Sequence, residues 1–344
     1  MPLPALALPA SVEAAVVVAG AMWLTLAPQI PAAMRHRGTL ALLTWLGSRA
    51  ALLALAHVHP ASLALPLAAD LVAWRALADA DGDGGEAAWA WAATPVVALF
   101  MIRAVPAAAL GAAAVALALA CARRGWRLTA GLALGSAAAF GGPWAACAAL
   151  PFALGGLRRP AELATIAVPV AAGLALAATH ALGGPWITPL GLPAPGSGPT
   201  LWRLPAALGA TAPAWAGWAL VAAAAVVGAM RSARANAAPE AIGTWGCCVL
   251  AALAPGITGA HLLPWLPFVC AWCAGDPDRR GWWVIEGLLL PLALLLEAGP
   301  LQGTAGFTWR WLAWILVPGS AVLALWPLRA MSIPTIAPRA ESAR

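Results

Sequence analysis

Five of the thirteen acidic residues lie between positions 59 and 93, with long apolar segments on either side. Asp70 has the most suggestive setting, because it follows the apolar run LALPLAA and precedes LVAWRAL. If 63–78 is a short interfacial helix, Asp70, Trp74 and Leu77 share one face by their spacing. A carboxylate on such a face is costly unless it is used or paired. The residues leave two interpretations open: a general base, or a helix-surface aspartate paired with a nearby arginine.

The acidic tip of this stretch, DADGDG at 79–84, imitates the start of a calcium-binding loop and contains an Asp-x-Asp pair. The bidentate glutamate expected at the twelfth position of such a loop is Ala90 instead. Glycine and acidic residues at a loop tip are most often simply solvated. We therefore expect no metal and no other cofactor.

Several other polar side chains fall within or beside apolar segments. Arg49 and Arg103 lie inside segments, where a charge costs at least about 2.5 kcal/mol, so each is a candidate partner for Asp70 or for a bound anion. Four histidines map to the outer parts of segments, which suits phosphate binding or proton transfer but also plain packing: His57, His59, His180 and His261. The CxxC spacing at 270–273 lies in an apolar segment and favours small core residues over a redox or metal pair.

The composition predicts an all-α, polytopic membrane protein. Hydrophobic residues make up 62% of the chain and charged residues 9%, against about 25% charged residues in a typical soluble domain. Backbone polar groups in lipid must pair within their own segment, so the apolar segments are expected to be helices. We expect crossings at about 12–33, 39–58, 95–121, 162–182, 206–229, 241–257, 260–274, 282–299 and 309–328. Residues 1–38 then form an extra helix ahead of a membrane domain at 39–330, and 331–344 form a tail.

The segment 128–156 predicts a re-entrant hairpin rather than a tenth crossing. Arginines flank both of its ends, and the helix-breaking sequence Phe140-Gly141-Gly142-Pro143 lies in its middle. A chain that enters the membrane and returns to the same side satisfies both observations. A second long loop is expected at 183–205, where proline and glycine are dense.

The distribution of arginine predicts the orientation. If the loop at 59–93 faces outside, most arginines fall on the cytoplasmic side, and outside there remain only Arg75, Arg203 and Arg310. The N-terminus is then outside and the C-terminus cytoplasmic. The tryptophans around the two outer loops fit an interfacial aromatic belt better than a stacking site for substrate: Trp74, Trp89, Trp91, Trp186 and Trp202.

Three stretches occur in an order that carries a family resemblance. They are DLVAW at 70–74, RLTAGLALGSAAAFGGPW at 127–144 and LAPGITGAHLLPWLPF at 253–268. Together they resemble the GT-C glycosyltransferases that use polyprenyl-phosphate sugars, in particular the bacterial mannosyltransferase-like branch. The likeness covers about residues 39–330. It differs from the family pattern at the hairpin lysine, which is Gly141 here, and at a Gln-Tyr pair, which is His261-Leu262.

The resemblance implies a GT-C-like fold in a bacterial plasma membrane with an extracytoplasmic active site. Asp70 is then the base that deprotonates the acceptor, a glycan or glycolipid, while a hexose, with mannose expected, leaves its polyprenyl phosphate. Cationic groups must hold that phosphate, and the candidates are His261, Arg75, Arg203, Arg310, Arg49 and Arg103. No metal and no nucleic acid is implied.

Two other classes of function stay open. A transporter or flippase would use Asp70, Arg49 and Arg103 to line a path through the membrane. A non-catalytic membrane partner of a glycan pathway would need none of them for chemistry.

Overall fold

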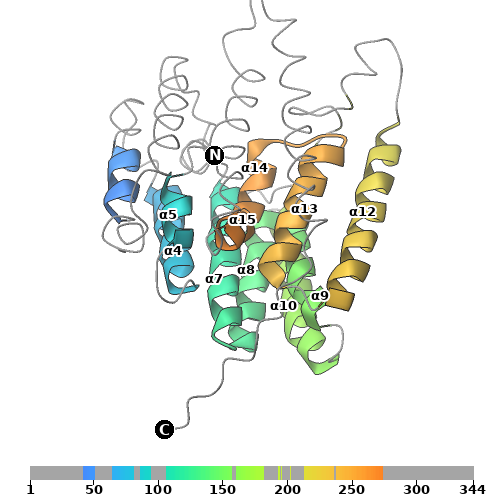
Figure 1. Ribbon diagram of the computed structural model, residues 1–344, viewed down its shortest axis with the longest axis horizontal. Helices are drawn as coiled ribbons and strands as arrows, with labels where there is room; N and C mark the ends of the chain where they lie inside the picture. The colour runs from blue at the N-terminus through green and yellow to red at the C-terminus, as the bar shows by residue number, and fades with distance from the viewer. Residues whose placement is uncertain are drawn as a thin grey trace, which may run out of the picture.

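The computed structural model describes residues 42–50, 64–80, 86–93, 106–156, 160–181, 213–235 and 238–273, together with positions 193, 195 and 202 (Figure 1). Within these ranges every regular element is a helix and none is a strand, which confirms the all-α class. By length and composition alone two stretches could cross a membrane, Arg127–Leu154 with 28 residues, which is broken at Gly142, and Ala161–Thr179 with 19. Nine crossings remain a prediction, because outside the described residues lie the segments at 12–33, 282–299 and 309–328, most of the loop at 183–205, and the tail.

The helices after residue 106 follow the predicted segments. They are α7 (Pro106–Arg123), α8 (Arg127–Ala146), η3 (Cys147–Ala149), α9 (Leu150–Gly156), α10 (Pro160–Ala181), α12 (Ala214–Ala235), α13 (Pro239–Leu253), α14 (Gly259–Leu262), η4 (Leu263–Trp265) and α15 (Leu266–Cys273). Residues 42–50 are also helical. The stretch predicted as an outer loop at 59–93 contains α4 (Ala64–Ala80) and α5 (Glu86–Ala93).

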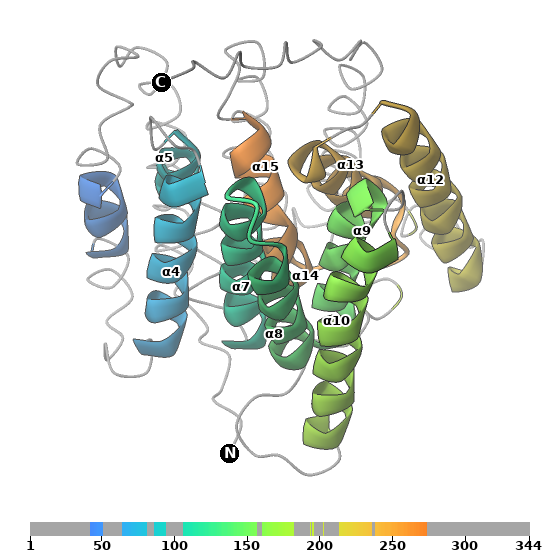
Figure 2. The ribbon, with the colours of Figure 1, turned by 90° about the horizontal axis from the view of Figure 1, so that it is seen from below.

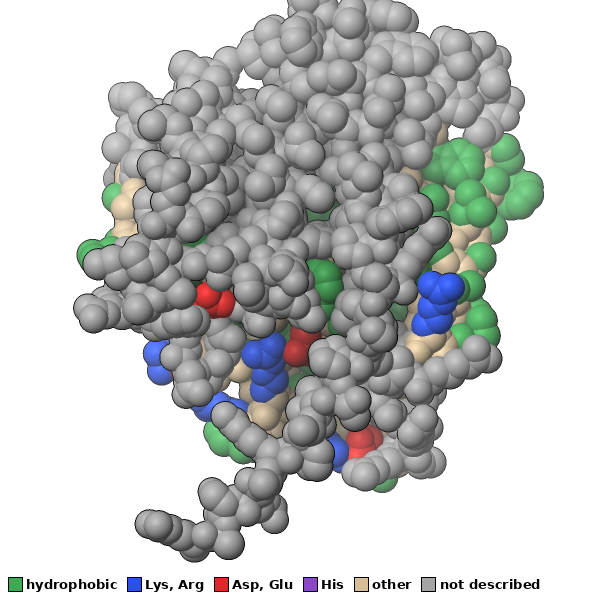
Figure 3. Space-filling view, viewed as in Figure 1, with side chains coloured by type: hydrophobic (Ala, Val, Ile, Leu, Met, Phe, Trp, Pro, Cys, Tyr) green, Lys and Arg blue, Asp and Glu red, His purple; other side chains and the backbone are tan. Residues whose placement is uncertain are grey.

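Arg123, the last residue of α7, joins three other helices at one end of the bundle. Its guanidinium donates to the carbonyl oxygen of Ala80 at 2.9 Å and to that of Ala271 at 3.5 Å, and it pairs with Glu240 at 3.0 Å. A cation here satisfies carbonyls left without partners at the ends of α4 and α15. We call this the basic end, defined by Arg75, Arg123, Arg124 and Arg127. In Figure 3 the charged side chains that can be seen gather in the lower half of the view.

Asp79, the first residue of the acidic tip, lies at this same basic end. α4 runs alongside α7 (Figure 2), and Asp79 near its C-terminus pairs with Arg75 at 2.9 Å and with Arg124 at 3.5 Å. The prediction that Asp79 and the basic turn at 123–127 lie on opposite sides is therefore wrong, whereas Asp81 and Asp83 lie outside the described residues. Asp70 and Arg75 interrupt the apolar pattern of α4. For this reason the sequence pattern predicts an interfacial helix where the structure has a helix of the bundle. Arg75, predicted outside, lies at the basic end as well.

The hairpin predicted at 128–156 has its break where glycine and proline place it. Gly142 has φ 66°, which favours glycine, and Pro143 follows it directly. Glycines of α8 meet α10 in increasing order, Gly131 against Thr165 and Gly135 against Pro169, so the two helices run in parallel. Arg127 at the start of α8 pairs with Glu162 at the start of α10. The chain between them therefore enters the bundle and returns to the basic end.

A second hairpin has the same form, and it covers the two crossings predicted at 241–257 and 260–274. α13 has Glu240 in its first turn, at the basic end, and α15 returns to Arg123, which contacts the carbonyl of Ala271. Its turn at 254–257 is buried rather than exposed at a surface. Both hairpins thus turn inside the molecule, about 22 Å from the basic end at 1.5 Å per helical residue, whereas α10 and α12 are longer with 22 residues each.

α10 presents apolar side chains to its surroundings along most of its length. Only 11% of its Ala161–Thr179 stretch is buried, and Val168 and Leu176 are among its exposed side chains. α12 on the far edge of Figure 1 exposes Trp215 and Leu220 in the same way. Extended exposed apolar surfaces of this kind are typical of proteins in contact with lipid.

Candidate functional site

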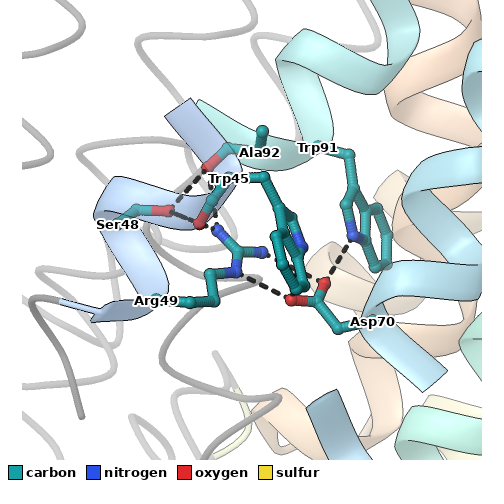
Figure 4. Close-up of polar contacts among 6 residues, drawn as sticks. All are labelled: Trp45, Ser48, Arg49, Asp70, Trp91 and Ala92. Atoms are coloured by element: carbon teal, nitrogen blue, oxygen red, sulfur yellow. Dashed lines mark hydrogen bonds and ion pairs between the residues drawn. The ribbon is translucent and has the colours of Figure 1, made fainter. Parts of the chain in front are cut away.

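Asp70 lies in the first half of α4 and is completely buried. Its carboxylate accepts four hydrogen bonds, two on each oxygen (Figure 4). Oδ2 accepts from Nε of Arg49 at 2.7 Å and from the indole of Trp45 at 2.8 Å. Oδ1 accepts from Nη2 of Arg49 at 3.1 Å and from the indole of Trp91 at 2.7 Å. The carboxylate therefore meets a two-pronged guanidinium on one side and two indoles beside it.

Arg49 is as deeply placed as its partner, with 3% of its side chain exposed. Its Nη1 donates to the carbonyl oxygen of Ala92 at 2.8 Å and to the hydroxyl of Ser48 at 2.9 Å. The guanidinium also lies 6.0 Å from the ring centroid of Trp45. The helix at 42–50, α4 and α5 are consequently tied together through one buried ion pair.

The geometry of Asp70 matches its second interpretation, pairing with an arginine, only in part. The residue is paired with an arginine, but it lies in the core and not on a helix surface. A general base must offer a lone pair to the proton that it takes, and all four acceptor positions are occupied here. Asp70 can act as a base only when Arg49 or an indole moves away from it.

The face of α4 that the spacing predicted is present, but the tryptophan at its centre has a different role. Asp70, Trp74 and Leu77 are all buried, as the i, i+4, i+7 pattern requires. The indoles that contact Asp70 come from Trp45 and Trp91 instead. Trp74, Trp89 and Trp91 were assigned to an interfacial belt, which is wrong, because each is at least nine-tenths buried in the core. Sequence reasoning missed Trp45, although its i, i+4 spacing to Arg49 was a usable signal.

The tips of the two hairpins meet at His261. The indole of Trp144, two residues after the Gly142 break, donates to the backbone carbonyl of His261 at 2.5 Å, and the two rings contact edge to face. Nδ1 of His261 lies 2.6 Å from the hydroxyl of Thr258. These contacts bring together the second and third stretches of the family resemblance. They also give His261 a packing role at the junction.

The other predicted residues do not join this cluster. Arg75 is 68% exposed and pairs with Asp79 on its own helix. His180 lies on α10, and its side chain is not described. Outside the described residues lie Arg103, Arg203, Arg310, Trp186, His57 and His59. Trp202 donates to the carbonyl of Leu253 at 2.8 Å, which ties the predicted second loop to the second hairpin.

No metal site emerges from the part of the chain that the structure covers. Its described residues contain no group of three or more His, Cys, Asp or Glu side chains placed to hold an ion. Asp81 and Asp83 of the acidic tip lie outside those residues. Cys270 is buried in the core, as are Cys247 and Cys248.

Comparisons with family models, with curated proteins and with solved structures found no match to this chain. The GT-C resemblance therefore stays a prediction. The site that any function must explain is the buried cluster of Arg49, Asp70, Trp45 and Trp91.

Proposed function

We propose that this protein is a GT-C-like glycosyltransferase of the bacterial plasma membrane, which transfers a hexose, with mannose expected, from a polyprenyl-phosphate donor to a glycan or glycolipid acceptor. The observation that carries the proposal is the pairing of Asp70 with Arg49 at 2.7 Å inside the bundle. Inverting transfer from a lipid phosphate needs one base and one cation close together, and this pair offers both. No other carboxylate among the described residues is buried.

The position of the pair along α4 fits an acceptor that arrives from the side opposite the basic end. Asp70 lies six residues from the N-terminus of α4 and ten from Ala80, or about 9 Å and 15 Å along the helix. If the basic end faces the cytoplasm, as arginine distribution favours, Asp70 lies nearer the outer face. The expected orientation, with the N-terminus outside and the C-terminus cytoplasmic, accompanies this proposal.

The chemistry follows from the two side chains. Asp70 takes the proton of an acceptor hydroxyl as the hydroxyl oxygen bonds to C1 of the sugar. The bond from C1 to the phosphate oxygen breaks, and the lipid phosphate leaves with its electron pair. Arg49 neutralises the charge that develops on the phosphate, which is the larger electrostatic task. The resemblance supports this assignment through the Asp70–Trp74 stretch.

Transfer from labelled polyprenyl-phosphate hexoses tests the proposal. Membranes that contain the wild type are expected to form a labelled glycan or glycolipid, and Asp70→Asn is expected to lower the rate at least about 100-fold. Asp79→Asn is the matched control, because it neutralises a partly exposed aspartate of the same helix, and it should keep transfer close to the wild-type rate. Absence of transfer by the wild type with every hexose donor would overturn the proposal.

A transporter or flippase is the second candidate, and one observation favours it. Two broken hairpins that enter from one end and meet inside the bundle, through Trp144 and His261, are a device that transporters use at membrane depth. Movement of a fluorescent polyprenyl-phosphate sugar across reconstituted vesicles, without its hydrolysis or transfer, would favour this class over the enzyme.

A further inference from the structure

The hydrogen bonds of Asp70 form two independent sets, one from Arg49 and one from the indoles of Trp45 and Trp91. Each carboxylate oxygen accepts one hydrogen bond from Arg49 and one from an indole. If the guanidinium turned to another anion, Trp45 and Trp91 would still hold the carboxylate, one on each oxygen. Each oxygen would then present one unoccupied acceptor position toward the place where Arg49 had been (Figure 4).

Arg49 is likewise held by contacts that do not depend on Asp70. Its Nη1 donates to Ala92 and Ser48, whereas Nε and Nη2 carry the two bonds to the carboxylate. A phosphate presents the same pair of oxygens to Nε and Nη2 as a carboxylate does. The guanidinium can therefore exchange the carboxylate for a phosphate while its Nη1 keeps its hydrogen bond to Ala92 of α5.

We propose that the Arg49–Asp70 pair is a closed state which the phosphodiester of the lipid-linked donor opens by taking the place of Asp70 on Arg49. The phosphate and the base compete for one cation, so Asp70 becomes able to accept a proton only when donor is bound. The acceptor hydroxyl then enters between the phosphate on Arg49 and the carboxylate held by the indoles. This inference rests on the proposed function, because it assigns the donor phosphate to Arg49.

Binding of a radiolabelled polyprenyl monophosphate to the full-length protein in nanodiscs tests the competition apart from catalysis. When the closed state dominates, the measured affinity is the intrinsic affinity reduced by the fraction of open molecules. Asp70→Asn removes the competing charge and should tighten binding by about tenfold to a hundredfold, for an open fraction of roughly 1–10%. Unchanged or weaker binding by Asp70→Asn would overturn the proposal.

A double variant guards against a failure to fold. Arg49→Gln combined with Asp70→Asn leaves no unpaired charge in the core, so it avoids the main penalty of the single variants. It should bind polyprenyl monophosphate no better than the wild type binds the uncharged polyprenol. Arg75→Gln, which removes an exposed arginine of α4, should leave binding unchanged. Wild-type affinity in the double variant would also overturn the proposal, whether or not Asp70→Asn folds.

The two proposals fail in different ways. If phosphate binding follows the expected pattern but no hexose is transferred, the proposed competition at Arg49 is supported and the proposed glycosyltransferase activity is overturned. If the wild type transfers hexose but phosphate binding is the same in the Arg49 and Asp70 variants, the proposed enzyme activity is supported and the proposed competition is overturned.

Discussion

Two ion pairs on α4 have the same chemical groups and opposite surroundings. Asp70 and Arg49 are 0% and 3% exposed, and the arginine comes from a different helix. Asp79 and Arg75 are 28% and 68% exposed and lie one turn apart on the same helix. In the buried pair every carboxylate lone pair has a donor, whereas the exposed pair shares its aspartate with Arg124 at 3.5 Å.

The difference shows that the position of a charge decides what it can do. A surface pair contributes about 0–1 kcal/mol and is screened by salt. A buried pair is no more stabilising than well-packed apolar groups, yet removal of one partner is severe. Burial of Asp70 and Arg49 is therefore costly, and so is the removal of either partner alone. Asp79 mainly fixes the end of α4 beside the basic turn.

The largest expected effect comes from breaking the buried pair. Arg49→Gln should lower the free energy of unfolding by about 3–5 kcal/mol, because it leaves a carboxylate buried without its cation. Arg75→Gln should cost less than about 1 kcal/mol. Thermal unfolding in detergent, followed by circular dichroism, measures both. Equal losses would mean that burial does not distinguish the two pairs.

A second comparison is between two buried tryptophans, one that donates a hydrogen bond to Asp70 and one that does not. Trp91→Phe removes a hydrogen bond to a charged group and should cost about 1.5–3 kcal/mol beyond any packing loss. Trp74 is also buried on α4, but among the described residues its indole nitrogen has no hydrogen-bond partner. Trp74→Phe should therefore be close to neutral or stabilising. A loss as large as that of Trp91→Phe would assign both effects to ring volume alone.

Sequence reasoning found the elements whose causes are local. The break at Gly142-Pro143 follows from the backbone preferences of two neighbouring residues, and the flanking arginines forced the chain to return. The helices α10, α12 and α13 follow from long apolar runs with few interruptions. The cost of a charge in an apolar setting predicts that Arg49 and Asp70 are functional candidates, and it makes their pairing one of the predicted arrangements.

What sequence reasoning missed depends on contacts between distant segments. Asp79 lies at the basic end because it pairs with Arg124, and a rule that counts arginines does not register an acidic partner. Tryptophans near predicted loops have the same pattern whether they belong to a belt or donate to a buried carboxylate. Only the packing of the helix at 42–50 and α5 against α4 brings Trp45 and Trp91 to Asp70.

Two glycines allow a comparison of tight and open packing, Gly135 on α8 and Gly47 in the helix at 42–50. A Cβ atom at Gly135 would lie 2.6 Å from the carbonyl oxygen of Pro169, because α8 and α10 approach closely there. Gly135→Ala should destabilise the protein by about 1–3 kcal/mol through overpacking. At Gly47 no described atom lies within 4 Å of such a Cβ, so Gly47→Ala should gain up to about 1 kcal/mol in helix propensity. Thermal unfolding of the two variants side by side tests this, and a stabilising Gly135→Ala would show that the two helices separate easily.

The smallest expected effect is also the most specific to surface electrostatics. Asp79→Asn should cost less than about 1 kcal/mol at low salt, because it removes exposed pairs with Arg75 and Arg124. At 1 M salt the Debye length is about 3 Å, so the cost should fall to nearly zero. The loss caused by Arg49→Gln should hardly change with salt, since ions do not reach a pair that is almost fully buried. Unfolding of both variants across a salt series separates the two behaviours. A salt-dependent loss at Arg49 would mean that water and ions enter the pair, and the buried cation would then be open to a phosphate without any prior separation from Asp70.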